Sequence, residues 1–141
     1  MDVVTLTAFL TPFLPYLLKA GEKAAEEAGK KLGEGLGAGA WEKAKALWTK
    51  LQPKVEAKPM AKGAAEELAN SPKDDDAKET LQKQLKKLLD EDRALAAEIA
   101  RLLEENPETV AKAINTYNVA QNVTGDYNKS IAVVQGDGTI N

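Results

Sequence analysis

The sequence contains no cysteine and no histidine. These absences exclude disulfides, thiol nucleophiles, Ser-His-Asp triads and imidazole ligands for zinc. Only carboxylates, lysines and hydroxyls remain for chemistry. Acids such as Glu66, Glu67, Glu104 and Glu105 follow no spacing that would bring them together or shift their pKa values. We therefore expect no enzyme, no catalytic residue, no cofactor and no metal site.

Basic charge is also in short supply, because 19 lysines and arginines face 22 acids and the formal net charge is -3. Without a basic field the chain has no means of attracting phosphates, and we expect no nucleic-acid partner. The N-terminus reads Met1-Asp2-Val3, with an acid where a signal peptide carries positive charge, which favours a cytoplasmic location. The length of 141 residues suits one domain plus a tail.

Long apolar runs are absent except at the N-terminus, where residues 3–18 carry no charge. We call this stretch the N-terminal segment. Its helical spacing predicts an apolar helix, with Asp2 placed to cap it and Pro12 and Pro15 placed to bend it. The apolar positions are Val3, Leu6, Phe9, Leu10, Phe13, Leu14 and Leu17.

Two environments suit the N-terminal segment. It is shorter than the roughly 20 apolar residues that span a bilayer, and in water it is expected to lie in the core of a helical body. The same helix is apolar enough to leave the body and insert into a membrane. A segment that is stable in both environments is what a switchable pore former needs.

A stripe of small residues follows, with Gly21, Ala25, Gly29, Gly33 and Gly37 at every fourth position. Such spacing lets two helices approach closely, in membranes and in soluble bundles alike. It predicts helix packing at Gly29, Gly33 and Gly37, either within the body or between copies. The alternative is a flexible stretch at the later glycines, because glycine weakens a helix interior.

Further helices are predicted by apolar periodicity and by capping residues. The first of these helices carries Trp41 and Trp48 and is expected to end at Pro53 and Pro59. Its two tryptophans fill a core or anchor a membrane interface. Ser71 to Asp74 resembles a capping box more than a calcium loop. The expected helical faces are Trp41, Ala44, Leu47, Trp48, Leu51 and Val55, then residues 61–69, then Leu81, Leu85, Leu88 and Leu89, then Leu95, Ile99, Leu102 and Leu103.

The helices predicted around residues 81–89 and 95–103 form an αα-hairpin, in which Lys83, Lys86 and Lys87 form a solvated face or touch anionic lipid. Asn106-Pro107 starts a final helix that is expected to run to about Asn115. The sequence thus predicts the all-α class, with a compact helical bundle over residues 1–116. A short amyloid-forming or disordered, β-prone tail is expected to follow over residues 117–141.

The tail is rich in amides, glycines and β-branched residues, and a V-x-G-D unit at Val123 recurs at Val134. Two such strand and turn units are too small to be stable as an isolated hairpin in water. Stacked copies could pair every backbone amide, with glutamine and asparagine ladders and a dry apolar seam. A disordered tail, or a hairpin docked on the body, is the alternative.

Two groups of tail residues form a recognisable pattern: Gln121, Asn122, Val123, Gly125, Asp126 and Asn128, followed by Ile131, Val133, Val134, Gln135, Gly136, Asp137, Gly138, Ile140 and Asn141. This pattern resembles the bacterial amyloid signalling motifs, prokaryotic counterparts of the animal RIP homotypic interaction motif and of fungal prion-forming motifs. It departs from the animal core in that Gln135 and Gly136 are adjacent, with no apolar residue between them.

In such families the motif follows a helical effector domain called Bell, which is likened to membrane-disrupting fungal HeLo-type domains. The resemblance implies a cell-death effector of bacterial innate immunity and antiphage defence, without catalytic activity. Its partners would be further copies of itself, an NLR-type receptor with a matching motif, and membrane lipids. It would be cytoplasmic at rest and lie at the inner membrane when activated. A non-lytic adaptor or scaffold, clustered through its tail, is the alternative.

Overall fold

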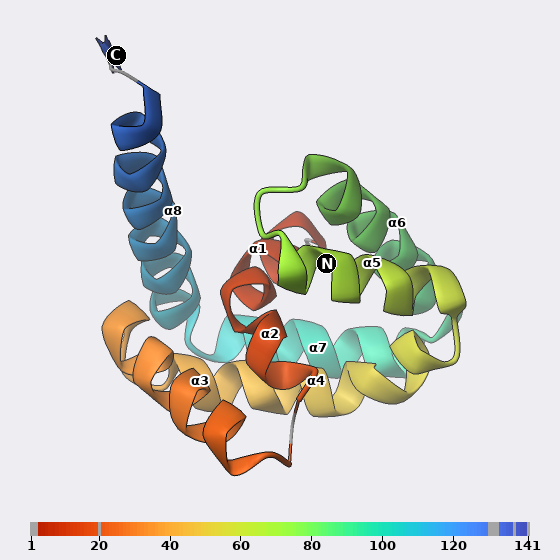
Figure 1. The fold of residues 1–141 in the computed structure, drawn as a ribbon. Helices are drawn as coiled ribbons and strands as arrows, with labels where there is room; N and C mark the ends of the chain where they lie inside the picture. Colours follow the sequence, from red (N-terminus) through yellow and green to blue (C-terminus); the bar gives the residue numbers. More distant parts are fainter. Residues whose placement is uncertain (1–2, 20, 130–132, 137, 141) are drawn as a thin grey trace.

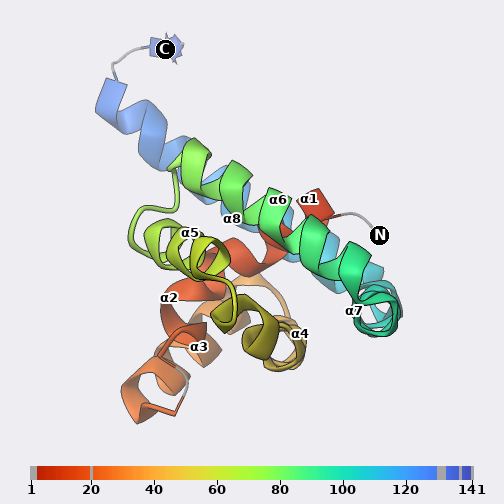
Figure 2. The ribbon, with the colours of Figure 1, turned by 90° about the vertical axis from the view of Figure 1, so that its right-hand side faces the viewer.

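The periodic segments of the sequence form helices in the computed structural model, which describes residues 3–19, 21–129, 133–136 and 138–140 (Figures 1 and 2). The predicted compact, helical bundle is confirmed. In chain order the elements are α1 (Val3–Leu10), the 3₁₀ turn η1 (Thr11–Phe13), α2 (Leu14–Leu17), α3 (Lys23–Leu36), α4 (Ala40–Glu56), α5 (Pro59–Asn70), α6 (Asp75–Glu91), α7 (Arg93–Glu105), α8 (Pro107–Lys129), β1 (Val133–Gly136) and β2 (Gly138–Ile140).

The N-terminal segment is bent at its prolines, as predicted. Pro12 lies at the start of η1 and Pro15 at the start of α2, and neither has an N–H to continue the α-helical ladder. The Thr7 hydroxyl donates to the Val3 carbonyl at 2.8 Å and the Thr11 hydroxyl donates to the Thr7 carbonyl at 2.6 Å. Both threonines can therefore be buried among apolar side chains without an unpaired hydroxyl.

Aspartates start the helices of the αα-hairpin. Asp74 caps α6 by accepting from the Ala77 N–H at 3.1 Å, so the cap is Asp74 and not Ser71 as the predicted capping box required. Asp92 ends α6 and caps α7 by accepting from the Leu95 N–H at 3.0 Å. Asp2, the predicted cap of the N-terminal segment, lies outside the described residues.

Two helices are longer than expected. Pro53 lies inside α4, which continues to Glu56, so only Pro59 marks a boundary, as the first residue of α5. α8 starts at Pro107 as predicted but runs past Asn115 to Lys129, across the division that the sequence places at residues 116 and 117. Residues 116–129 contain no proline, so the helix can propagate from its packed first half.

Beyond α8, β1 and β2 pair antiparallel, with Gln135 opposite Thr139. Ile131, Asp137 and Asn141 of the predicted amyloid core lie outside the described residues. An amyloid-forming tail concerns stacked copies of the chain and therefore stays a prediction.

The N-terminal segment lies in the middle of the bundle in both views (Figures 1 and 2). α1 packs on α6 and α8, whereas α2 packs on α3 and α5. α4 and α7 close the other side, and α3 lies at the edge of the bundle beside α4. The most apolar part of the sequence is thus the centre around which the amphipathic helices are arranged.

Candidate functional site at the buried N-terminal segment

The apolar positions predicted to insert into a membrane form the centre of the core. Leu6, Phe9, Leu10, Phe13, Leu14 and Leu17 are each at most 2% exposed. Val3, at the beginning of α1, is only partly buried. The structure thus places these positions together in the environment expected of the resting state.

Trp41 connects the N-terminal segment to the outer helices. Its ring centroid lies 5.8 Å from that of Phe13, which in turn lies 5.8 Å from that of Phe9. These distances are typical of favourable aromatic pairs. The chain of three rings therefore runs from α1 through η1 to α4.

Trp41 also lies against the small-residue stripe of α3. A Cβ atom built on Gly29 would lie 2.5 Å from two ring carbons of Trp41, and one built on Gly33 would lie 2.6 Å from the Trp41 Cβ atom. Any larger residue would collide, so α3 can approach α4 this closely only with glycine at both sites. Gly37 is not in this contact; it follows the last residue of α3 with φ at +151°.

Three polar groups at the edge of the indole, from Glu26, Trp41 and Lys45, connect α3 to α4. Trp41 Nε1 donates to Glu26 Oε1 at 3.3 Å, and Lys45 forms an ion pair with the same carboxylate. The Lys45 ammonium also lies 5.5 Å from the centre of the Trp41 ring. The hydrogen bond from Lys45, aided by the one from Trp41, holds the pKa of Glu26 below its ordinary value, although partial desolvation opposes this.

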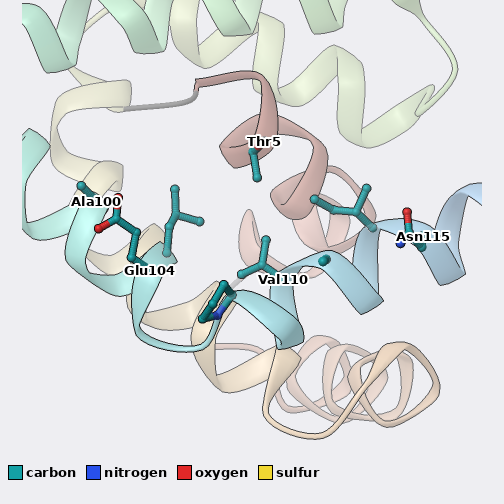
Figure 3. A pocket seen from close by; sticks show the side chains of 9 residues that line it. Thr5, Ala100, Glu104, Val110 and Asn115 are labelled. Carbon is teal, nitrogen blue, oxygen red and sulfur yellow. The ribbon is translucent and has the colours of Figure 1, made fainter.

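A groove of about 390 Å³ opens on the other side of the N-terminal segment, between α1, α7 and α8 (Figure 3). Thr5 lies on the α1 wall, Leu103 on the α7 wall, and Val110 and Ile114 on the α8 wall. Nearby Val4 is 59% exposed, whereas Phe13 is fully buried. The start of α1 is therefore the least covered part of the segment.

Sequence reasoning missed two buried polar groups of α4. Lys43 is 8% exposed and its ammonium donates to the Leu102 carbonyl near the end of α7, where carbonyl groups lack helical partners. Trp48 is buried, and its Nε1 has no hydrogen-bond partner within the described part of the chain. Lys43 lies beside Ala44 on the predicted apolar face, so only the packing of α7 could reveal its role.

The predicted amyloid core is separate from this site. Within the described residues, its members in 121–129 belong to α8 and those in 133–136 and 138–140 to the two strands. Tyr117, the first tail residue, packs against the core, and burial together with the nearby Tyr16 raises the pKa of its phenol. The body and the tail therefore meet on α8.

The four glutamates considered as catalytic candidates do not lie together. Glu66, Glu67, Glu104 and Glu105 are all exposed and lie on two different helices. Among the described residues there is no group of three or more acids that could hold a metal ion. Over the same residues, no helix combines the length and the apolarity that crossing a bilayer would take.

Comparison with protein-family models, with curated proteins and with solved structures found no match for this chain.

The contact between Gly33 and Trp41 leads to a stability prediction. We expect Gly33→Ala to lower the free energy of unfolding by about 1–3 kcal/mol, because the added methyl meets the Trp41 backbone and must push α3 outward. Urea denaturation followed by circular dichroism measures this change. Gly35→Ala is the matched control on the same helix, since its Cβ would meet nothing within 4 Å. Equal losses in both variants would contradict the close contact.

The lowered pKa values lead to a prediction about pH. The pKa of Asp92, like that of Glu26, lies below its ordinary value, chiefly because the Leu95 N–H donates to its carboxylate. A carboxyl group whose pKa is lower in the folded than in the unfolded chain stabilises the fold above its unfolded pKa. This contribution is lost as the pH falls through the folded pKa, so stability should decline below about pH 4. Urea denaturation at several pH values should show a shallower decline for Glu26→Gln, and an unchanged decline would contradict the assignment.

Proposed function

We propose that this chain is a cell-death effector of bacterial innate immunity that disrupts membranes when its tail assembles. One observation carries the proposal: its one long uncharged segment is stored in the centre of a bundle of charged, amphipathic helices. The tail motif supplies a means of gathering many copies. No catalytic role is assigned to any residue.

The N-terminal segment is far more stable when it passes from the core into another apolar environment than when it is exposed to water. Six large side chains of the segment are almost fully buried, and moving them into water would cost roughly 10–20 kcal/mol. That cost is comparable with the whole stability of a small domain. The segment can therefore leave the core only where another apolar environment, such as a bilayer, accepts the same side chains.

Assembly of the tail provides the trigger. An NLR-type receptor with a matching motif would nucleate the tail at residues such as Val123 and Val134, and the growing fibre would add further copies. Helical bodies attached to one fibre are held at a high local concentration, which favours cooperative insertion of several segments. The protein would then move from the cytoplasm to the inner membrane.

A dye-release assay tests this proposal. Purified full-length protein is added to anionic vesicles that contain a self-quenching dye, with or without fibres grown from a synthetic peptide of residues 117–141. We expect rapid release only when the fibres are present, because they template the tail and concentrate the N-terminal segments.

Val133→Pro is the matched control, since proline removes an N–H that a stacked strand requires and lies beyond the last helix. This variant should keep the stability of the wild-type body and release no dye. Protein that joins the fibres but leaves the vesicles intact would contradict membrane disruption and would favour the adaptor. Release by wild type without any fibres would contradict activation through the tail.

A further inference from the structure

α3 contacts α2, α4 and α8, but it buries fewer large apolar side chains than the hairpin helix α6 does. Its buried residues are Ala25, Gly29, Gly33 and Leu36, of which two have no side chain. α6, by contrast, buries Leu81, Leu85, Leu88 and Leu89. Since hydrophobic stabilisation follows the apolar area removed from water, α3 gains less from its packing than the hairpin helices do.

The polar attachment of α3 is weak as well. Glu26 and Lys45, which join α3 to α4, keep 44% and 42% of their side-chain surfaces exposed. Exposed ion pairs contribute about 0–1 kcal/mol and are screened by salt. The hydrogen bond from Trp41 ends on the same exposed carboxylate. Loss of the Glu26 position would therefore release both polar contacts together.

The ends of α3 permit it to move as a unit. Gly21 before the helix has φ at +101° and Gly37 after it has φ at +151°. Glycine occupies both signs of φ at little cost, so these positions can change conformation without side-chain strain. Hinges of this kind absorb rotations of a rigid element between them.

α3 covers the aromatic contact of the N-terminal segment. The Trp41 side chain contacts both the glycines of α3 and the ring of Phe13 in η1. α2 also packs directly on α3. If α3 moved away, water would reach Trp41 and the neighbouring side chains of η1 and α2.

We propose that α3 is a hinged cover that opens before the rest of the bundle, and that its opening loosens η1 and α2 while α6 stays packed. The cover would hold the N-terminal segment in the resting state. This inference goes beyond the proposed function, because it concerns the order of opening in water and needs neither a membrane nor a fibre.

Native-state hydrogen exchange, measured by mass spectrometry on the full-length protein, tests the proposal. In the wild type, amides of α3 should exchange at least about tenfold faster than those of α6, through an opening smaller than global unfolding. Lys45→Ala should raise exchange in α3, η1 and α2 by about two- to fivefold, the effect of losing an exposed ion pair. Exchange in α6 should not change.

Lys50→Ala is the matched control. Lys50 lies on the same helix and forms a similarly exposed ion pair with Glu98 of α7, at 3.6 Å, so its loss should leave exchange in α3 unchanged. Gly33→Ala provides a second, stronger perturbation and should raise exchange in α3, η1 and α2 by roughly tenfold or more.

Equal exchange of α3 and α6 in the wild type would overturn the proposal, since no separate opening would exist. Faster exchange in α3 alone, without η1 and α2, would overturn its role as a cover. A uniform increase in all helices of both variants would do the same. These results are independent of dye release, so a failed cover and a failed membrane activity can be told apart.

Discussion

The packing of Trp41 against Gly29 and Gly33 is the contact on which the arrangement of the outer helices depends. The indole contacts both the glycines of α3 and the ring of Phe13, so a single side chain joins the edge of the bundle to its centre. The fit needs glycine on α3, and this lowers the apolar area that holds the helix in place. The glycines of α3 therefore account both for its close approach to α4 and for its weak attachment to the bundle.

The N-terminal segment links the resting structure to the proposed activity. Its side chains stabilise the bundle because they are apolar, and that same property would stabilise them in a bilayer. The proposed activation would then require only a small free-energy difference between the core and the bilayer, and not the full cost of exposing these side chains to water. In the proposed mechanism, many segments held along one fibre would favour the membrane, because the fibre raises their local concentration.

The sequence predicted what depends on local pattern. The leucines of α6 and the start of α8 at Pro107 follow from periodicity and capping, and both are found. The packing of Trp41 against Gly29 and Gly33 could not be predicted, because a stripe of small residues does not indicate which helix will pack on it. α8 extends beyond its predicted end near Asn115. Asn, Thr and Val favour other structures locally, whereas a helix already stabilised by packing continues through them.

The most direct measurement follows the N-terminal segment itself. The chain has no cysteine, so a thiol introduced by Val4→Cys, at a position 59% exposed, can carry one environment-sensitive fluorophore. When vesicles and tail fibres are both present, its emission should shift to the blue, as the probe enters hydrocarbon. A probe at Glu79→Cys on α6, whose native side chain is 70% exposed, should stay in water. A Val4 probe that remains in water while the vesicles leak would contradict the account.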